Sequence, residues 1–271
     1  MKKWFSVFLM VLFTVSSAFS AGMIEPNLQD KINSTDEAEL IPVLIVMDQQ
    51  ADFDLVYNHV KNMTKIERRS EAISIFKSIA ENSQYQLRSI LEQSELTGDA
   101  KDLRYLWIVN AVGGKLTPRT IESVSRLAGV NRIHLDEERY ALNVEPGYQH
   151  VPPTDDITWS VEMVNGPDVW NLGYQGDGVL VAIVDTGVNY NHTDLVNRMW
   201  DGNPTYPHHG WDFYNNDNDP YDDHVYGGHG SHCAGITAGD GTSGTQTGIA
   251  PQAEIMAVKV LNASGNGSEY T

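Results

Sequence analysis

Two short motifs in the second half of the sequence carry residue types suited to proton transfer. Asp185 directly follows the apolar run 179–184, and His229 lies in the glycine-rich segment 227–235. A histidine that transfers protons needs a pKa near neutrality and a partner that holds one tautomer. Asp185 is a candidate for that partner, although an aspartate that only caps the next element fits the motif equally well. His232 lies three residues after His229 and is expected to be structural.

The elements that must position these two side chains can be predicted from the apolar pattern. The runs 179–184 and 253–261 are typical of strands buried on both faces of a parallel sheet. In open α/β sheets, functional groups gather beyond the carboxyl ends of such strands, which is where Asp185 lies. A helix that begins at His229 would point the side chain of His232 elsewhere. The predicted fold class is therefore α/β.

A metal-dependent hydrolase is an alternative that these residue types leave open. Zinc sites need about three converging protein ligands, and the spacing here matches no helical His-Glu-x-x-His motif. The residues that could take part are His208, His209, Asp212, Asp222, Asp223, His224, His229 and His232.

Composition and charge exclude several classes of protein. The 271 residues include 36 Asp and Glu and 18 Lys and Arg, which gives a net charge of −18. This balance argues against binding to nucleic acid or anionic membranes, because neutralising phosphate needs Lys and Arg. The single cysteine, Cys233, excludes an intrachain disulfide framework and zinc sites built from several thiolates. Residues 151–271 hold 16 acids and two bases, so the two halves differ in charge.

The first 20 residues have the order of a secretory signal peptide. Two lysines precede the apolar run 4–15, and small residues follow at Ala18 and Ser20. The run is shorter than the about 20 residues of a membrane span, so cleavage is expected rather than an uncleaved anchor. We expect a secreted protein, extracellular or periplasmic, with no stable membrane insertion after cleavage.

Residues 41–145 predict a separate module without a catalytic motif. We expect strands at 41–47 and 105–112, joined by a helical stretch that ends near Leu96. A second helix follows Thr117-Pro118 and ends at Gly129, and strands 130–135 and 139–142 then pair. The order is β-α-β-α-β-β. The polar segment 22–39 is expected to be irregular.

The two chemical motifs together resemble those of subtilisin-like serine proteases, the subtilases. Val184-Asp185-Thr186-Gly187-Val188 is similar to the aspartate motif of that family, and residues 229–235, His-Gly-Ser-His-Cys-Ala-Gly, are similar to its histidine motif. Ser231 replaces the commoner threonine and keeps its hydroxyl. Residues 170–178 and 248–253 resemble flanking segments of the family, and 41–145 resembles its inhibitory propeptide.

The resemblance implies a secreted endopeptidase precursor, a zymogen that hydrolyses peptide bonds of polypeptide substrates. Asp185 would orient and support His229, and His229 would act as the general base for a serine. The family's serine and oxyanion asparagine lie farther along its chain and are not found here, so this chain alone is expected to be inactive. Ser243 stands in Gly-Thr-Ser-Gly but lacks the family's continuation, which indicates a loop residue.

The resemblance also implies the domain order. A signal peptide, 1–20, would precede a ferredoxin-like α+β propeptide, 41–145, and an incomplete, parallel-sheet subtilisin-like peptidase domain, 155–271. Gly265, Asn266 and Gly267 correspond to the edge that pairs with an extended substrate. The end of the propeptide, around 142–148, would occupy this edge as an intramolecular inhibitor. A non-enzymatic inhibitor of the propeptide type and a degenerate protease are the alternatives.

Calcium is the cofactor that the resemblance suggests. The acid-rich loop 217–223 offers carboxylates to a hard cation, although a solvated acidic loop has the same composition. The expected structural calcium ligands are Asp194, which matches a ligand position of the family, Asp217, Asp219, Asp222 and Asp223. Cys233 beside the histidine is similar to the cysteine of thiol-containing subtilases, and burial as a small apolar residue is its expected role.

Overall fold

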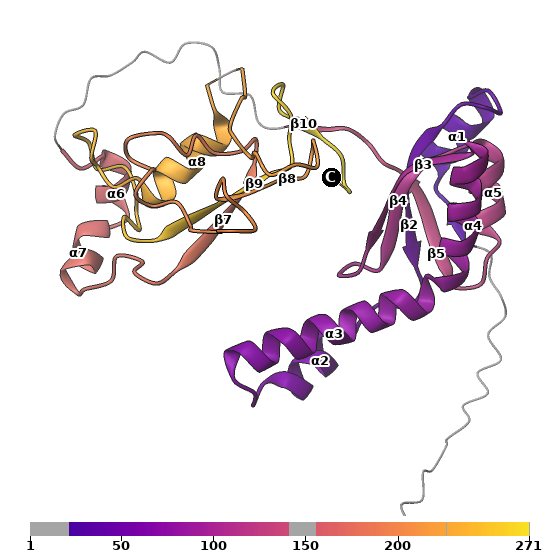
Figure 1. Cartoon of the computed structure of the whole chain (residues 1–271), viewed down its shortest axis with the longest axis horizontal. Coiled ribbons are helices and arrows are strands. Elements are labelled where there is room, and N and C mark those ends of the chain that lie inside the picture. Colours follow the sequence, from indigo (N-terminus) through magenta and orange to yellow (C-terminus); the bar gives the residue numbers. More distant parts are fainter. Residues whose placement is uncertain (1–21, 141–155, 226, 271) are drawn as a thin grey trace, which may run out of the picture. The chain divides into compact units, whose positions relative to one another are not determined.

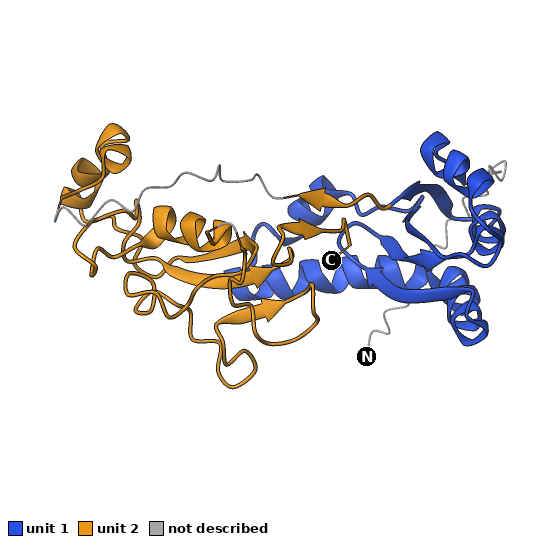
Figure 2. Cartoon of the chain, turned by 90° about the horizontal axis from the view of Figure 1, so that it is seen from above, with its two compact units in different colours: residues 1–135 blue, residues 136–271 orange. Residues whose placement is uncertain are grey.

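The computed structural model describes residues 22–140, 156–225 and 227–270, so the export signal predicted over 1–20 lies outside the described residues. The chain divides into two compact units, residues 1–135 and 136–271 (Figure 2). Each unit has its own core of buried apolar side chains. No helix in the described part of the chain is long and apolar enough to cross a membrane.

The first unit is built on a five-stranded sheet (Figure 1). Its strands are β1 (Met23–Ile24), β2 (Ile41–Met47), β3 (Ala100–Leu106), β4 (Ala111–Leu116) and β5 (Val130–Leu135). Their order in space is β1-β5-β2-β4-β3. All neighbours are antiparallel except β1 and β5, which are parallel. The apolar run 41–47 therefore forms the central strand, as its composition predicts.

Three of the five helices of this unit cover the sheet and complete its core. The five helices are α1 (Pro26–Ser34), α2 (Phe53–Val60), α3 (Lys65–Ser83), α4 (Tyr85–Thr97) and α5 (Pro118–Ser125). α1 and α5 pack against β5, and α4 packs against β3. Leu91 of α4 and Ile121 of α5 are fully buried there. The apolar faces of these helices are thus used against one sheet.

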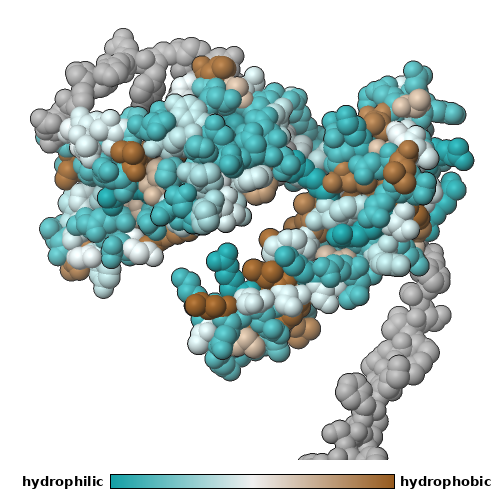
Figure 3. All heavy atoms as spheres, in the orientation of Figure 1, coloured by the Kyte–Doolittle hydropathy of each residue, from teal (hydrophilic) through white to brown (hydrophobic). Residues whose placement is uncertain are grey.

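The α2 and α3 helices form an arm that projects from this sheet (Figure 1). α3 begins with a capping box made by Thr64 and Glu67. The rings of Phe53 and Phe76 pack with their centroids 5.3 Å apart. Apolar side chains are nevertheless exposed on the arm, and Ile66 exposes 83% of its surface (Figure 3). The arm is held mainly by contacts between its own two helices.

The prediction that residues 22–39 are irregular is wrong. This segment contains β1 and α1, and Leu28 and Ile32 of α1 are buried in the core of the first unit. The polar composition concealed a short amphipathic helix, because only one turn-spaced pair of apolar residues faces the sheet.

The prediction of one strand over 105–112 is also wrong. β3 ends at Leu106, and β4 begins at Ala111. Asn110 turns the chain with a φ of 39°, and its side-chain oxygen accepts a hydrogen bond from Gln84 at 2.9 Å. The buried polar contacts of Asn110 thus fix a hairpin within an apolar stretch. From β2 to β5 the observed order is β-α-α-α-β-β-α-β, because α2, α3 and α4 all lie between β2 and β3.

The second unit is built on a three-stranded parallel sheet with the order β7-β9-β8 (Figure 1). The strands are β7 (Leu180–Asp185), β8 (Gly210–Asp212) and β9 (Glu254–Lys259). The helices are α6 (Trp159–Met163), α7 (Gly166–Asn171) and α8 (His229–Ala238). α8 packs against β7 and β9. Ala234 of α8 and Ile255 of β9 are fully buried at this contact.

Two predictions for the second unit need correction. β7 is not buried on both faces: Ile183 is 8% exposed, whereas Val184 is 62% exposed. In the described residues β7 is an edge of the sheet, and α8 covers one of its faces. The strand predicted over 139–142 is β6 (Arg139–Tyr140), which pairs with β10 (Asn266–Gly267) instead of with β5.

Candidate active site

The carboxylate of Asp185 and the imidazole of His229 meet where β7 ends and α8 begins. Asp185 is the last residue of β7, and His229 is the first residue of α8. Both carboxylate oxygens of Asp185 lie 2.8 Å from Nδ1 of His229. Their side chains are 14% and 22% exposed. The structure therefore brings together the two residues that the sequence singled out for proton transfer.

This contact assigns the tautomer of His229. An ionised carboxylate can only accept hydrogen bonds, so Nδ1 of the neutral ring carries the proton and donates it to Asp185. Nε2 then holds the free lone pair, and it makes no hydrogen bond to another described residue. A neutral imidazole that is oriented through Nδ1 and open at Nε2 can act as a general base.

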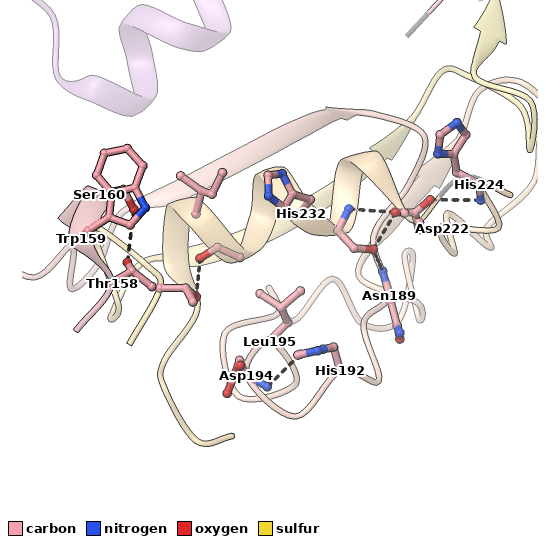
Figure 4. A pocket seen from close by; sticks show the side chains of 16 residues that line it. Thr158, Trp159, Ser160, Asn189, His192, Asp194, Leu195, Asp222, His224 and His232 are labelled. Carbon is pink, nitrogen blue, oxygen red and sulfur yellow. Dashed lines mark hydrogen bonds between the residues drawn. The ribbon is translucent and has the colours of Figure 1, made fainter. Parts of the chain in front are cut away.

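The carboxylate of Asp222 connects the two motifs. Its Oδ1 accepts from the hydroxyl of Thr186 at 2.9 Å, and its Oδ2 accepts from the amide and the hydroxyl of Ser231 at 2.8 and 2.6 Å. The same hydroxyls accept from the Gly230 amide at 2.9 Å and from the Asn189 amide at 2.8 Å. Figure 4 shows Asp222 and Asn189 beside the first turn of α8, where each forms a hydrogen bond with Ser231. The network holds the loop after β7 against the helix that begins at His229.

Lys259 supplies a second connection beneath the same loop. It ends β9 opposite Asp185 and is only 2% exposed. Its ammonium group donates to the carbonyl of Thr186 at 2.6 Å and to Asp223 Oδ1 at 2.7 Å. A buried ammonium must be paired in this way to offset its lost hydration. The Asp185 loop is therefore held from two sides.

A cavity of about 810 Å³ opens beside α8 (Figure 4). His192, His224 and His232 line it together with Asp194. Asp185 and His229 are not among its lining residues, so we do not assign this cavity to the reacting groups. His232 faces this cavity rather than Asp185, which is the different direction expected for a helix that begins at His229.

The carboxylates expected to bind calcium are engaged with different protein donors. Asp219 accepts from the Tyr190 hydroxyl at 2.8 Å, and Asp194 accepts from the Ser243 amide at 2.5 Å. Within the described residues, the set contains no three carboxylates whose oxygens all lie within 4.8 Å of one another. In the described residues these carboxylates thus do not converge on one point. The full expected set is Asp194, Asp217, Asp219, Asp222 and Asp223.

The ligands expected for a metal-dependent hydrolase also do not converge in the described residues. Among the described side chains, the group of three potential ligands that does converge is Asp185, His229 and Cys233. His209 instead bonds the carbonyl of Trp200 through Nδ1 at 2.9 Å. The geometry of the described residues does not favour the metallohydrolase interpretation.

The three residues expected at a substrate edge lie together next to β6. Gly265 adopts a φ of 80° and leads into β10, which contains Asn266 and Gly267. β10 pairs antiparallel with β6, so that Asn266 faces Tyr140 and Gly267 faces Arg139. The segment 142–148, which we expected to fill this edge, lies outside the described residues.

Sequence reasoning missed the structural roles of Thr186, Asp222 and Lys259. The motifs give Thr186 no role of its own, and the acidic loop suggests calcium binding for Asp222. One signal is present in the sequence: Lys259 is the only lysine in residues 151–271 and lies within the apolar run 253–261. A lone base in an acidic segment is a candidate for a buried ion pair.

The close approach of α8 to the loop after β7 predicts a strict requirement for Gly230. A Cβ at this position would lie 2.1 Å from the carbonyl oxygen of Gly187 and 3.1 Å from Cβ of Asp185. Gly230→Ala should displace the first turn of α8 and lower the free energy of unfolding by about 1–3 kcal/mol, the usual cost of overpacking. Denaturant unfolding measures this change.

Gly235→Ala in the same helix is the matched control. A Cβ there meets nothing within 4 Å, so the variant should be neutral or more stable by up to about 1 kcal/mol, because alanine favours helix. Equal destabilisation by the two variants would contradict the close approach at Gly230.

The environment of Cys233 predicts an unreactive thiol. Its Sγ lies 3.9 Å from Nδ1 of His229, and burial, followed by the carboxylates of Asp185 and Asp222, raises the pKa of the thiol. Because the thiolate is the reactive form, alkylation by iodoacetamide at pH 7 should be several-fold slower in the folded chain than in the urea-unfolded chain. Equal alkylation rates would show that the thiol is neither shielded nor held protonated.

Comparison with known proteins shows which family the segment around this site resembles. Residues 176–271 match Peptidase S8, the subtilase family. The chain is 29% identical over 215 residues to bacillopeptidase F of Bacillus subtilis (strain 168), covering 74% of this chain and 15% of that protein. It is 41% identical over 108 residues to thermitase of Thermoactinomyces vulgaris, covering 40% of this chain and 34% of that protein.

It is also 38% identical over 123 residues to minor extracellular protease Vpr of Bacillus subtilis (strain 168), covering 43% of this chain and 14% of that protein. The chain thus spans between 14% and 34% of the length of these three relatives. The matched residues 176–271 include β7, α8, Asp185 and His229, so this segment of the chain is similar to the subtilase family.

Proposed function

We propose that the protein is a serine endopeptidase that hydrolyses peptide bonds in extended polypeptides. The observation that carries the proposal is the 2.8 Å contact between Nδ1 of His229 and the Asp185 carboxylate, within the segment that matches the subtilases. Nε2 of His229 would take the proton of a serine hydroxyl as that oxygen attacks the peptide carbonyl, and would then give it to the leaving amine. Asp185 would stabilise the imidazolium that forms in between.

The nucleophile and the oxyanion-hole donors have no assignment among these 271 residues. The proposal therefore concerns a protein that contains these 271 residues together with a nucleophile and oxyanion-hole donors. In that protein, His229→Ala should lower kcat against an unstructured polypeptide such as casein by several orders of magnitude, because the base is lost. His232→Ala, in the same helix but lining the cavity, is the control and should keep most of the activity.

Labelling by a fluorophosphonate reports the nucleophile in the same preparation. Labelling that disappears in His229→Ala and persists in His232→Ala supports the proposal. A complete protein that neither cleaves casein nor takes the label would instead support a degenerate protease or a non-enzymatic inhibitor. Labelling at Ser243 would overturn its interpretation as a loop residue.

We further propose that the protein is exported and that its first unit is an inhibitory propeptide of ferredoxin-like fold. The order of β2–β5 is β-α-β-β-α-β when the consecutive helices α2, α3 and α4 are taken as one connection, and this order supports that fold. The 215 residues aligned with bacillopeptidase F exceed the length of the second unit, so the similarity extends into the first. The signal-like residues 1–20 and a relative named as extracellular, Vpr, support export.

The pairing of β6 with β10 supports inhibition by the segment that follows the first unit. An added strand gains main-chain hydrogen bonds without demanding particular side chains, so the same edge could take substrate or inhibitor. Residues 22–146, which include the buried α1, should therefore inhibit the processed enzyme. A version that ends at 135 keeps the five-stranded sheet but lacks β6, and should inhibit much less. Equal inhibition by both versions would contradict this role for β6.

Calcium binding remains part of the proposal, without an assigned site. If a structural calcium is bound, the melting temperature of the protein should rise with millimolar calcium relative to chelator, by mass action. An unchanged melting temperature would remove calcium from the account.

A further inference from the structure

The ion pair between Arg139 and Glu269 spans the β6–β10 pair. Gly267 lies directly opposite Arg139, and Glu269 follows two residues later along the chain. Because side chains alternate faces with a period of two, Arg139, Gly267 and Glu269 share one face of this two-stranded sheet. The guanidinium group of Arg139 donates a hydrogen bond to Oε1 of Glu269.

The chain requires glycine at position 267. A Cβ on Gly267 would lie 2.4 Å from the carbonyl oxygen of Val260 and 2.8 Å from a methyl group of Leu261. No side chain at 267 can therefore come between the paired strand and Glu269. The side chain of Glu269 is 28% exposed, compared with 57% for that of Arg139, so the acid is the more enclosed partner.

The opposite face of the β6–β10 pair carries different polar groups. The side-chain amide of Asn266 donates to Oε1 of Glu138 at 2.9 Å, and the Tyr140 hydroxyl donates to Oε2 of Glu138 at 2.8 Å. The edge thus presents an amide donor on one face and a carboxylate on the other. A cation is accommodated only on the face of Glu269.

The distribution of charged residues along the chain agrees with a cation-binding role for the face of Glu269. Arg139 is the only lysine or arginine between residues 133 and 197, and it follows three consecutive acids. The single base of this segment is thus the residue that lies against Glu269. The surrounding region 151–271 carries 16 acids and two bases, a net charge of −14, which favours the approach of cationic segments.

We propose that Glu269 is a specificity-determining residue: it selects polypeptide segments that carry arginine, or less favourably lysine, at the residue that pairs with Gly267. This inference rests on the proposed function, since it treats β6 as occupying the edge that substrates use. Arginine is favoured over lysine because its planar guanidinium matches a carboxylate with two donors. Glu269 would act on binding and would take no part in proton transfer.

The first experiment tests the contact in the 271-residue chain by hydrogen–deuterium exchange of residues 262–270. Arg139→Glu and Glu269→Arg should each raise exchange in this segment, because each places like charges face to face. The double variant Arg139→Glu/Glu269→Arg should recover much of the protection, and Arg139→Lys should lose less than Arg139→Gln. Glu162→Arg on α6 makes the same charge change away from β10 and should leave the segment unaltered.

The second experiment tests selection. The Arg139→Glu chain, whose own strand is weakened, is offered synthetic peptides of sequence Glu-Glu-Xaa-Tyr-Ala-Leu in which Xaa is Arg, Lys, Gln or Glu. Protection of residues 262–270 should require about two- to fivefold less of the Arg peptide than of the Gln peptide, the range expected for an exposed ion pair. The Glu peptide should bind least. The single variant Glu269→Arg, whose own strand is weakened by the like charges of Arg139 and the new arginine, should reverse this order.

Equal protection by all four peptides, or an order unchanged by Glu269→Arg, would overturn the inference. Failure of the double variant to recover protection would do the same. These outcomes are separable from the proposed peptidase activity, because peptide binding is measured without bond cleavage. A complete protein that cleaves casein but shows no preference at this position would keep the function and refute the specificity.

Discussion

The buried carboxylate of Asp222 is the constraint on which the geometry of the second unit depends. It is 8% exposed, and it accepts hydrogen bonds from Thr186, from Ser231 and, at 3.2 Å, from the amide of His224. A charge in such a position is tolerated only when it is fully hydrogen-bonded. Its donors come from the loop after β7 and from the start of α8, so satisfying this one carboxylate also fixes those two segments together. The 2.8 Å contact between Asp185 and His229 follows from that attachment.

The polar groups that stabilise the loop after β7 also position the proposed general base. Lys259 and Asp222 hold the loop around Thr186, and that loop carries the carboxylate that orients His229. The imidazole is therefore positioned through Nδ1 before any substrate arrives, and Nε2 is left open. Preorganisation of this kind is what allows a general base to act without spending substrate-binding energy on its alignment. The strand edge at Gly267, which we propose binds peptide, lies on the segment that follows β9 of the parallel sheet.

The sequence was most informative where chemistry and periodicity coincide. The apolar runs ending at Asp185 and beginning near Ala253 predict β7 and β9, and the motifs single out Asp185 and His229 as a pair. It was least informative where tertiary contacts override composition. The hairpin at Asn110 depends on hydrogen bonds to residues about 27 positions away, and α1 buries only two apolar side chains in an otherwise polar segment. For the same reason the sequence does not reveal the hydrogen bonds of Asp222 to Thr186 and of Asp223 to Lys259, whose partners only the fold brings near.

The central claim is that His229 is held by Asp185 in the tautomer of a general base. The most direct test is 15N NMR of the imidazole nitrogens of His229 in the folded 271-residue chain, compared with Asp185→Asn. The account predicts that the neutral ring carries its proton on Nδ1, that this proton is protected from solvent exchange, and that Asp185→Asn abolishes both properties. A neutral ring protonated on Nε2, or one that Asp185→Asn leaves unchanged, would contradict the account.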